Sequence, residues 1–386
     1  MAEGNRPLEG IRVFDMTRVL AGPYCTALLA DLGAEVIKLE PPGGDDYRHV
    51  GPFRDGESAL FLLTNRGKQS IAVDLKREAG RKLAQDVAAT CDVAVENFRP
   101  GVAAKLGLGP DDLRSRRPDT VYASISGFGQ TGPWTGLPAY DLVVQALSGL
   151  MAVTGEEGGQ PLKVGESFGD LVAGLFASWA ILAALLRRAR TGEGAVIDVA
   201  MHDALFALLP TAHAQYLYAG QEPRRVGNRH PLSTPFGCYR AADGLVAVAV
   251  LNDRQFAAFA ALIGAAGIEA DARFATDAAR TLNEPALRRM IEAWTGTRAT
   301  GDLVAALSAA HIPCAPIRSV AEAVHSPQTQ ARGLVGEVVH PTLGPVPVVG
   351  QPVRFDGEKW QSDRAAPRLG ADADAVLGAI SGKAVT

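Results

Sequence analysis

The chain has 386 residues, a net charge of −4 and 21% charged residues. This length exceeds what a single small core needs, so we expect one large domain and a smaller one. The charge balance argues against a nucleic-acid partner. The four cysteines are scattered and form no C-x-x-C pair. Their spacing argues against a zinc site and a disulfide framework and favours a reducing compartment.

The first ten residues are polar and lack the apolar region of a signal peptide. We therefore expect a soluble, cytoplasmic protein without a membrane partner. Hydrophobic residues make up 47% of the chain, enough for a core and a subunit interface.

Short strands alternate with helices in the first third of the chain. The pattern predicts strands at 11–14, 35–39, 70–73, 93–95 and 121–125, and helices at 23–32 and 78–89. This alternation predicts a parallel sheet in a doubly wound, Rossmann-like α/β domain. Ligands of such sheets bind beyond the carboxyl ends of the strands.

A dinucleotide site is the first possibility to test. Glu40 ends the second strand, where dinucleotide-binding folds carry an acidic ribose ligand. The loop at 15–23, however, has no G-x-G-x-x-G, and Pro23 occupies the region that would cradle phosphate. We therefore reject NAD as a cofactor, and no P-loop lysine motif occurs either.

Cationic and polar residues follow several of the predicted strands. They are Arg18, Lys38, Lys76, Asn97, Arg99 and Lys105. A solvated face is the default interpretation of scattered Lys and Arg. Their recurrence at strand ends favours a second interpretation, a polyanionic ligand that carries phosphate.

The segment at 165–170 precedes an uncharged run from 171 to 186. That run predicts a buried helix and is short for a membrane span. Asp170 then lies at the helix N-terminus, where free N–H groups and the helix dipole favour an ionised carboxylate. Gly169 would let another molecule approach the backbone. A plain helix cap is the alternative role of Asp170.

The pattern of predicted elements changes near residue 223. A strand at 195–199 and a helix at 202–209 are followed by a hairpin around Asp243-Gly244 and helices at 254–264, 284–294 and 300–310. We expect a large domain whose N-terminal part is 1–222, a small α+β domain at 223–320, and a return to the large domain at 321–386, with short strands between 335 and 355.

Several separate motifs resemble class III CoA transferases, the superfamily of formyl-CoA transferase, carnitine CoA-transferase and α-methylacyl-CoA racemase. They lie, in the order of that family, at 18–23, 32–40, 95–101, 126–129, 139–141, 169–170, 191–194 and 227–231. The resemblance implies a Rossmann-like domain that binds CoA, a two-domain chain and an interlocked homodimer. It also implies acyl-CoA and a small carboxylic acid as substrates, with no metal and no NAD.

The resemblance also implies site residues. The family nucleophile corresponds to Asp170, which would form an aspartyl anhydride and then an aspartyl-CoA thioester, with oxyanions held by N–H groups near Gly169. Asp141 stands where formyl-CoA transferase has a Glu, or else simply begins a helix. The implied CoA contacts are Arg18, Ala21, Lys38, Val73, Asp74, Leu75, Lys76, Asn97, Phe98, Arg99, Lys105, Ala139 and Tyr140. Lys105 replaces a family Arg and loses its bidentate fork.

Departures from the family pattern bear on specificity. Leu20 replaces a Gln of formyl-CoA transferase, which argues against formate or oxalate. Tyr140 replaces the His of the racemases, and a phenol is a poor base at neutral pH. An acyl-CoA isomerase and a non-catalytic acyl-CoA-binding protein remain as alternatives to a transferase.

Arg229 and His230 admit two interpretations. They form an ordinary turn, or they bind the free carboxylate of a dicarboxylic acid and reach into the partner's active site. The motif at 227–231, together with 252–255, resembles succinyl-CoA-dependent dicarboxylate transferases.

Overall fold

The computed structural model describes residues 6–383, which form two compact units. The large unit contains the chain up to Leu150, Lys163–Pro210 and the chain from Gln328 onward. The small unit contains Met151–Leu162 and Thr211–Pro327. Its bounds differ from the predicted 223 and 320, and it includes a segment before Lys163 that the sequence pattern did not separate from the large domain.

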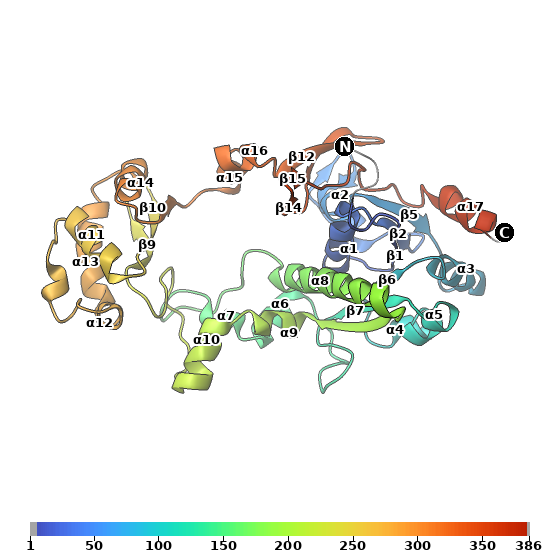
Figure 1. Cartoon of the computed structure of the whole chain (residues 1–386), viewed down its shortest axis with the longest axis horizontal. Coiled ribbons are helices and arrows are strands. Elements are labelled where there is room, and N and C mark those ends of the chain that lie inside the picture. Colours follow the sequence, from blue (N-terminus) through green and yellow to red (C-terminus); the bar gives the residue numbers. More distant parts are fainter. Residues whose placement is uncertain (1–5, 384–386) are drawn as a thin grey trace. The chain divides into compact units, whose positions relative to one another are not determined.

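A six-stranded parallel sheet forms the centre of the large unit, in the order β5-β2-β1-β6-β7-β8 (Figure 1). The strands are β1 (Arg12–Asp15), β2 (Glu35–Glu40), β5 (Lys68–Ala72), β6 (Val93–Glu96), β7 (Val121–Ser126) and β8 (Ala195–Ala200). The parallel α/β sheet predicted from the alternation of strands and helices is therefore confirmed. The strand order reverses between β1 and β6, and ligands of doubly wound sheets bind at that point.

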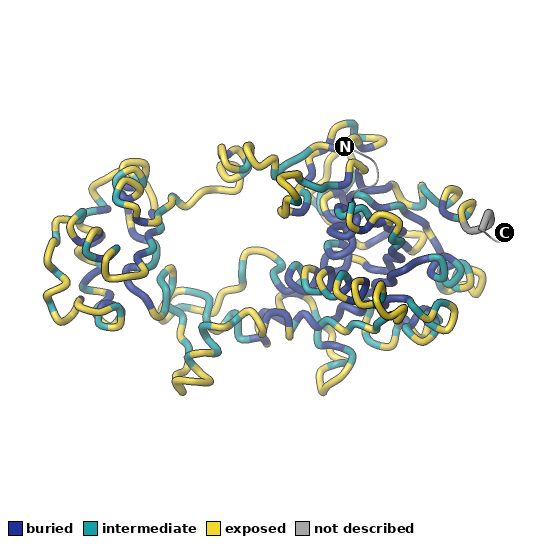
Figure 2. Tube along the Cα trace, in the orientation of Figure 1, coloured by how far each residue is buried: buried dark blue, intermediate teal, exposed yellow. Residues whose placement is uncertain are grey.

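Helices cover both faces of this sheet, so its strands are buried on both sides (Figure 2). On β1, Val13 packs with α1 (Ala21–Asp31) and α8 (Phe168–Thr191), and its neighbour Phe14 packs with α3 (Glu78–Ala88). Adjacent side chains thus point to opposite faces of the sheet, as they do in any β-strand. The C-terminal helix α17 (Ala373–Lys383) also contributes to the second face.

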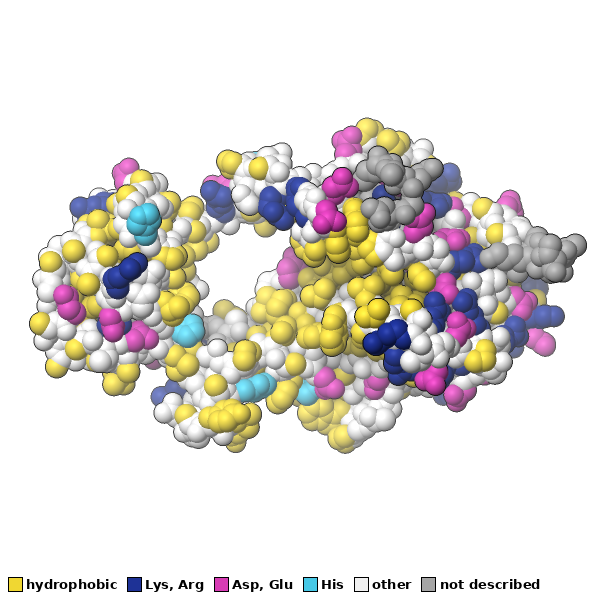
Figure 3. Space-filling model, viewed as in Figure 1, with side chains coloured by type: hydrophobic (Ala, Val, Ile, Leu, Met, Phe, Trp, Pro, Cys, Tyr) yellow, Lys and Arg dark blue, Asp and Glu magenta, His cyan; other side chains and the backbone are white. Residues whose placement is uncertain are grey.

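Helix α8 carries both buried and exposed apolar residues. It begins at Phe168 and ends at Thr191, so it is longer than the predicted 171–186. Gly174 faces α1, where an added Cβ would lie 2.5 Å from the Ala21 carbonyl oxygen. Leu175 and Trp179 are 55% and 66% exposed, and hydrophobic side chains gather over this helix in Figure 3. The helix predicted in the uncharged run is therefore present, and in the single chain only one side of it is buried.

Among the described residues, α8 is also the one helix with the length and hydropathy to cross a membrane. One side of this helix packs against α1 and the sheet.

Short elements complete the large unit. Those in loops of the first half are η1 (Asp46–His49), β3 (Phe53–Arg54), β4 (Glu57–Ser58), α2 (Ala59–Thr64), α4 (Val102–Lys105), α5 (Pro110–Arg116) and α6 (Asp141–Leu147). Later come α9 (Met201–Ala207), α16 (Pro327–Ala331), β12 (Val335–His340), β13 (Gly344–Val349), β14 (Arg354–Phe355) and β15 (Glu358–Lys359). Two short helices, α7 (Leu150–Val153) and α10 (Pro210–His213), lie where the chain passes between the units.

The small unit has an antiparallel sheet in the order β11-β10-β9. The strands are β9 (Phe236–Arg240), β10 (Leu245–Ala249) and β11 (Cys314–Pro316). The hairpin predicted around Asp243-Gly244 is confirmed by the pairing of β9 with β10. Helices α11 (Asp253–Leu262), α13 (Glu284–Thr295) and α14 (Thr300–Ala309) bury one face of this sheet. Further short elements are η2 (Ala214–Tyr218), η3 (Ile268–Ala270), α12 (Asp277–Leu282) and α15 (Val320–Val324).

Candidate active site

A buried ionic network supports the loop that follows β1. Asp15 ends the strand and accepts a hydrogen bond from Lys68 at 2.9 Å. Lys38 donates to the Thr17 carbonyl at 2.8 Å and pairs with Asp45 at the same distance. The Lys38 side chain has no exposed surface. It therefore has no atom with which to meet a ligand, which disagrees with the CoA contact predicted for it.

Two side chains fix the backbone of this loop. Asn97, after β6, accepts from the Arg18 N–H at 2.9 Å and donates to the Arg18 carbonyl at 2.8 Å. Asp45, after β2, accepts from the Val19 N–H at 3.0 Å. Val19 has a φ of 67°, which is strained for a β-branched residue. The amide of Asn97 thus joins two loops, and Asn97 also lines the cavity that contains Asp170.

Asp170 lies in the first turn of α8, whose N-cap is Ser167. It is therefore not the helix cap that the sequence suggested. Its carboxylate meets the Ala21 backbone N–H, which begins α1. The Gly169 N–H instead donates to Asp141 at 2.8 Å. An added Cβ at Gly169 would meet Val144 at 2.8 Å, so the absence of a side chain there serves helix packing, and the Gly169 N–H is not free to hold an oxyanion.

The pKa of Asp170 is raised to about 7. Burial is the largest cause, and the nearby negative charge of Asp141 adds to it, while the Ala21 hydrogen bond acts in the opposite direction. Burial and the second carboxylate therefore act against the ionised form that we expected the helix N-terminus to stabilise. Asp141 itself is buried at the start of α6 and accepts from both Gly169 and Gln145.

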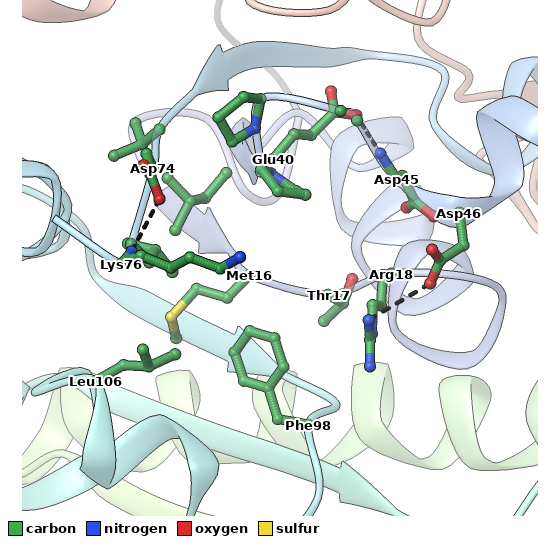
Figure 4. Close-up of a pocket in the computed structure, with 17 residues that line it drawn as sticks. Met16, Thr17, Arg18, Glu40, Asp45, Asp46, Asp74, Lys76, Phe98 and Leu106 are labelled. Atoms are coloured by element: carbon green, nitrogen blue, oxygen red, sulfur yellow. Dashed lines mark hydrogen bonds and ion pairs between the residues drawn. The ribbon is translucent and has the colours of Figure 1, made fainter.

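A cavity of about 540 Å³ lies beyond the carboxyl ends of β1, β2, β5 and β6 (Figure 4). Its lining includes the predicted residues Val73, Asp74, Leu75, Lys76, Arg18 and Phe98. In Figure 4 the Lys76 side chain extends into the cavity, opposite Arg18, and the Phe98 ring lies below Lys76 and to the left of Arg18. Arg18 pairs loosely with Asp46 at 3.4 Å, and both side chains are exposed. Two cations therefore border a space large enough for part of a nucleotide.

A smaller cavity of about 170 Å³ contains Asp170. The predicted residues that line it are Arg18, Ala21, Asn97, Phe98, Arg99, Ala139, Tyr140 and Asp170. Arg18, Asp46 and Phe98 also line the larger cavity. Residues from motifs far apart in the sequence therefore meet at one edge of the sheet, with a carboxylate at one end and Lys76 at the other.

Some residues differ from expectation. Lys105 is exposed on α4 and lines neither cavity. Tyr47 was not predicted, yet its pKa is raised to about 12 by burial and by the negative charge of Asp170. Glu96, also not singled out as a site residue, accepts from the Phe98 N–H at 2.7 Å, and burial raises its pKa to about 7. In the sequence, the turn-rich stretch at 41–45 was the available sign of Tyr47, and the position of Glu96 at the end of a predicted strand was the sign of that carboxylate.

Arg229 and His230 line a third cavity, of about 620 Å³, within the small unit. It lies on the sheet face that carries Cys238 and Ala247. The His230 ring stacks on Phe236, and its Nδ1 accepts from the Leu232 N–H at 3.2 Å. In the neutral ring the proton is therefore on Nε2. Arg229 pairs with Glu157 and Glu284.

Comparisons with known proteins show the family of the chain. The family model described as CoA-transferase family III matches residues 8–373. Succinate–glutarate CoA-transferase of Agrobacterium fabrum is 41% identical over 379 residues, 96% of this chain and 95% of that protein. Succinyl-CoA:glutarate CoA-transferase of Mus musculus is 40% identical over 95% of this chain and 84% of that protein. The crystal structure of a CaiB/BaiF family protein from Brucella suis has a TM-score of 0.86 at 38% identity and covers 98% of this chain and 100% of that one.

Proposed function

The chain belongs to CoA-transferase family III, and we propose that it moves CoA from an acyl-CoA such as succinyl-CoA to a dicarboxylic acid. The observation that carries the proposal is the place of Asp170. Its carboxylate lines a cavity at the carboxyl edge of the sheet, and that cavity shares Arg18 and Phe98 with a larger one.

The two cavities suit the two ends of an acyl-CoA. The larger one offers Lys76 and Arg18 to phosphate groups and a wall of Leu39, Val73 and Leu75 to the adenosine. The pantetheine arm would pass Phe98 and bring the thioester to Asp170. This path requires no metal and no NAD, since every group that it needs is a side chain, a backbone N–H or the substrate.

The proposed reaction proceeds through two covalent intermediates. The ionised Asp170 attacks the carbonyl carbon of the thioester. The C–S bond of the thioester then breaks, CoA leaves as a thiolate, and a mixed anhydride of Asp170 and the donor acid remains. The thiolate then attacks the aspartyl carbonyl, which releases the donor acid and leaves an aspartyl-CoA thioester. The acceptor carboxylate repeats these steps in reverse, and acyl-CoA and free Asp170 result.

The raised pKa of Asp170 serves this chemistry. A carboxylate with a pKa of about 7 is more basic than an ordinary Asp, and basicity increases the nucleophilicity of the ionised form. The Ala21 N–H is a hydrogen-bond donor for the negative oxygen that develops beside it. We assign to this donor the role that the resemblance gave to N–H groups near Gly169.

The names of similar enzymes support a dicarboxylate acceptor, since two of them act on succinate and glutarate or their CoA esters. Within the chain, Arg229 and the Nε2 proton of His230 are the groups that we assign to the acid's free carboxylate. We further propose an interlocked homodimer, in which these residues reach the active site of the partner subunit. The four unpaired cysteines fit a cytoplasmic location.

A screen of carboxylic acids as CoA acceptors tests this function. With succinyl-CoA as donor, we expect new CoA esters with glutarate and related dicarboxylates, and at least a 100-fold lower rate for Asp170→Asn. An isomerase would instead exchange the α-proton of an acyl-CoA with deuterated water, without an acceptor acid. An Asp170→Asn variant that transfers CoA at the native rate would refute the proposal.

A further inference from the structure

The guanidinium of Arg229 has a partner for each of its nitrogens. Its Nε donates to the Val226 carbonyl at 3.2 Å. One terminal nitrogen lies 3.7 Å from Glu284, and the other donates to Glu157 in a short ion pair. An acid substrate that takes the position of Glu157 at this terminal nitrogen would compete with the Glu157 carboxylate for Arg229.

The two carboxylates that hold Arg229 differ in how easily they can leave. Glu284 begins α13, its side chain is 6% exposed, and it also binds Arg288 at 2.6 Å. Breaking that buried arrangement would leave charges without a partner, at high cost. The Glu157 side chain is 72% exposed, so on release it regains water at once. Exposed pairs of this kind contribute about 0–1 kcal/mol.

The release requires only the Glu157 side chain to turn away, because Arg225 holds the backbone of its segment at Ala152 and Gly159. The segment lies between Gly155, with φ 131°, and Gly158, with φ 72°. It connects α7 to the stretch before α8, and its exposed turn is closed by a hydrogen bond from the Gly159 N–H to the Glu156 carbonyl at 3.0 Å. The Glu157 carboxylate thus reaches Arg229 from a surface loop, while Arg229 lines the cavity with Asn228 and His230.

We propose that Glu157 is a specificity-determining residue that occupies Arg229 in place of the free carboxylate of the acid substrate. A dicarboxylate displaces it and forms the same kind of ion pair. A monocarboxylate has no second carboxylate with which to do so, and leaves Arg229 capped and the cavity without a free cation. The inference rests on the proposed function, because it takes Arg229 as the site of the acid's distal carboxylate.

The test compares acceptors in the full-length enzyme. With saturating succinyl-CoA at fixed ionic strength, Glu157→Gln should lower the KM for glutarate about two- to fivefold, because the internal competitor is gone. The KM for butyrate, which has one carboxylate, should stay within the error of the wild type. Glu222→Gln is the matched control, since it removes an exposed charge from the same unit, and it should change neither value.

Variants of Arg229 separate the inference from the function on which it rests. Arg229→Lys keeps the positive charge but loses the bidentate hydrogen-bonding geometry of the guanidinium, and Arg229→Gln loses both. Each should raise the KM for glutarate, and the effect of Glu157→Gln should vanish in the Arg229→Gln background. If the Arg229 variants raise this KM but Glu157→Gln leaves it unchanged or raises it, the inference about Glu157 is wrong and the acceptor site stands. If folded Arg229 variants leave it unchanged, the assignment of Arg229 fails and the inference with it.

Discussion

At the scale of single residues, two buried carboxyl groups at or near the site have pKa values close to neutrality. Asp170 has a pKa of about 7 because it is buried beside Asp141. Glu96 has a pKa of about 7 because it is buried beneath the Phe98 turn. Only the ionised form of Asp170 can attack a thioester, so its titration should govern the rate.

The pH profile of the reaction follows from the ionisation of Asp170. Because the pKa of Asp170 is raised, the carboxylate is mostly protonated at pH 6 and mostly ionised at pH 8. We expect kcat/KM to rise about tenfold over this interval and to level off above it. The measurement is the rate of succinyl-CoA consumption with glutarate in buffers of constant ionic strength.

Glu96→Gln is the control for this profile. The amide oxygen of Gln can still accept the Phe98 N–H, but the side chain no longer titrates. The variant should keep the rise through about pH 7. A flat profile in this variant would assign the titration to Glu96 and contradict the role of Asp170.

At this scale the sequence predicted which residues line the site better than it predicted their contacts and charge states. The motifs led to Asp170, Phe98 and Lys76, which line the two cavities. They did not reveal that Asn97 holds the Arg18 backbone or that Lys38 is wholly buried. Those facts depend on contacts between loops that are far apart in the chain, and a single sequence does not state them.

At the scale of elements, the position of Asp170 depends on the close contact between α1 and α8. Gly174 on α8 faces the carbonyl of Ala21, and the N–H of the same Ala21 meets the Asp170 carboxylate. The close packing of the two helices therefore sets the distance between the nucleophile and its hydrogen-bond donor.

Gly174→Ala tests this contact. The new methyl group would lie 2.5 Å from the Ala21 oxygen, so the helices must separate. We expect a loss of about 1–3 kcal/mol in the free energy of unfolding, and a lower kcat. Gly301→Ala, in the first turn of α14 with no atom within 4 Å, is the control and should be neutral or slightly stabilising. Equal stability of the two variants in urea would contradict the account.

The strands and helices themselves were largely predictable, since short continuous apolar runs mark strands that are buried on both faces of a parallel sheet. The extent of α8 was less predictable. Its composition is apolar all round, which a helix in a core and a helix at a subunit interface share. The pattern therefore indicated a buried helix, whereas part of its surface is exposed in the single chain.

At the scale of the whole molecule, the exposed apolar face of α8 supports the proposed homodimer. Leu175, Trp179 and Leu186 recur at helical spacing and are exposed. Trp179→Glu should place a charge in the interface, yield monomers in size-exclusion chromatography with light scattering, and lower activity at least tenfold. Leu282→Glu, at another exposed apolar residue, is the control. A dimeric and fully active Trp179→Glu variant would exclude this face from the interface.

The division into units was harder to predict than the fold of either unit. Residues 151–162 belong to the small unit because Arg225 and Arg229 hold this segment, with donation from Arg225 to the carbonyls of Ala152 and Gly159. Nothing in the local composition of the segment distinguishes it from an ordinary loop of the large domain.

Trapping the covalent intermediate is the most direct test of the claim that Asp170 is the nucleophile. The enzyme is incubated with succinyl-CoA and hydroxylamine, which attacks the aspartyl carbonyl of an anhydride or thioester, and its peptides are analysed by mass spectrometry. We predict a hydroxamate on Asp170, formed only with acyl-CoA present and absent from Asp170→Asn. A modification at another residue, or none while the enzyme turns over, would contradict Asp170 as the nucleophile.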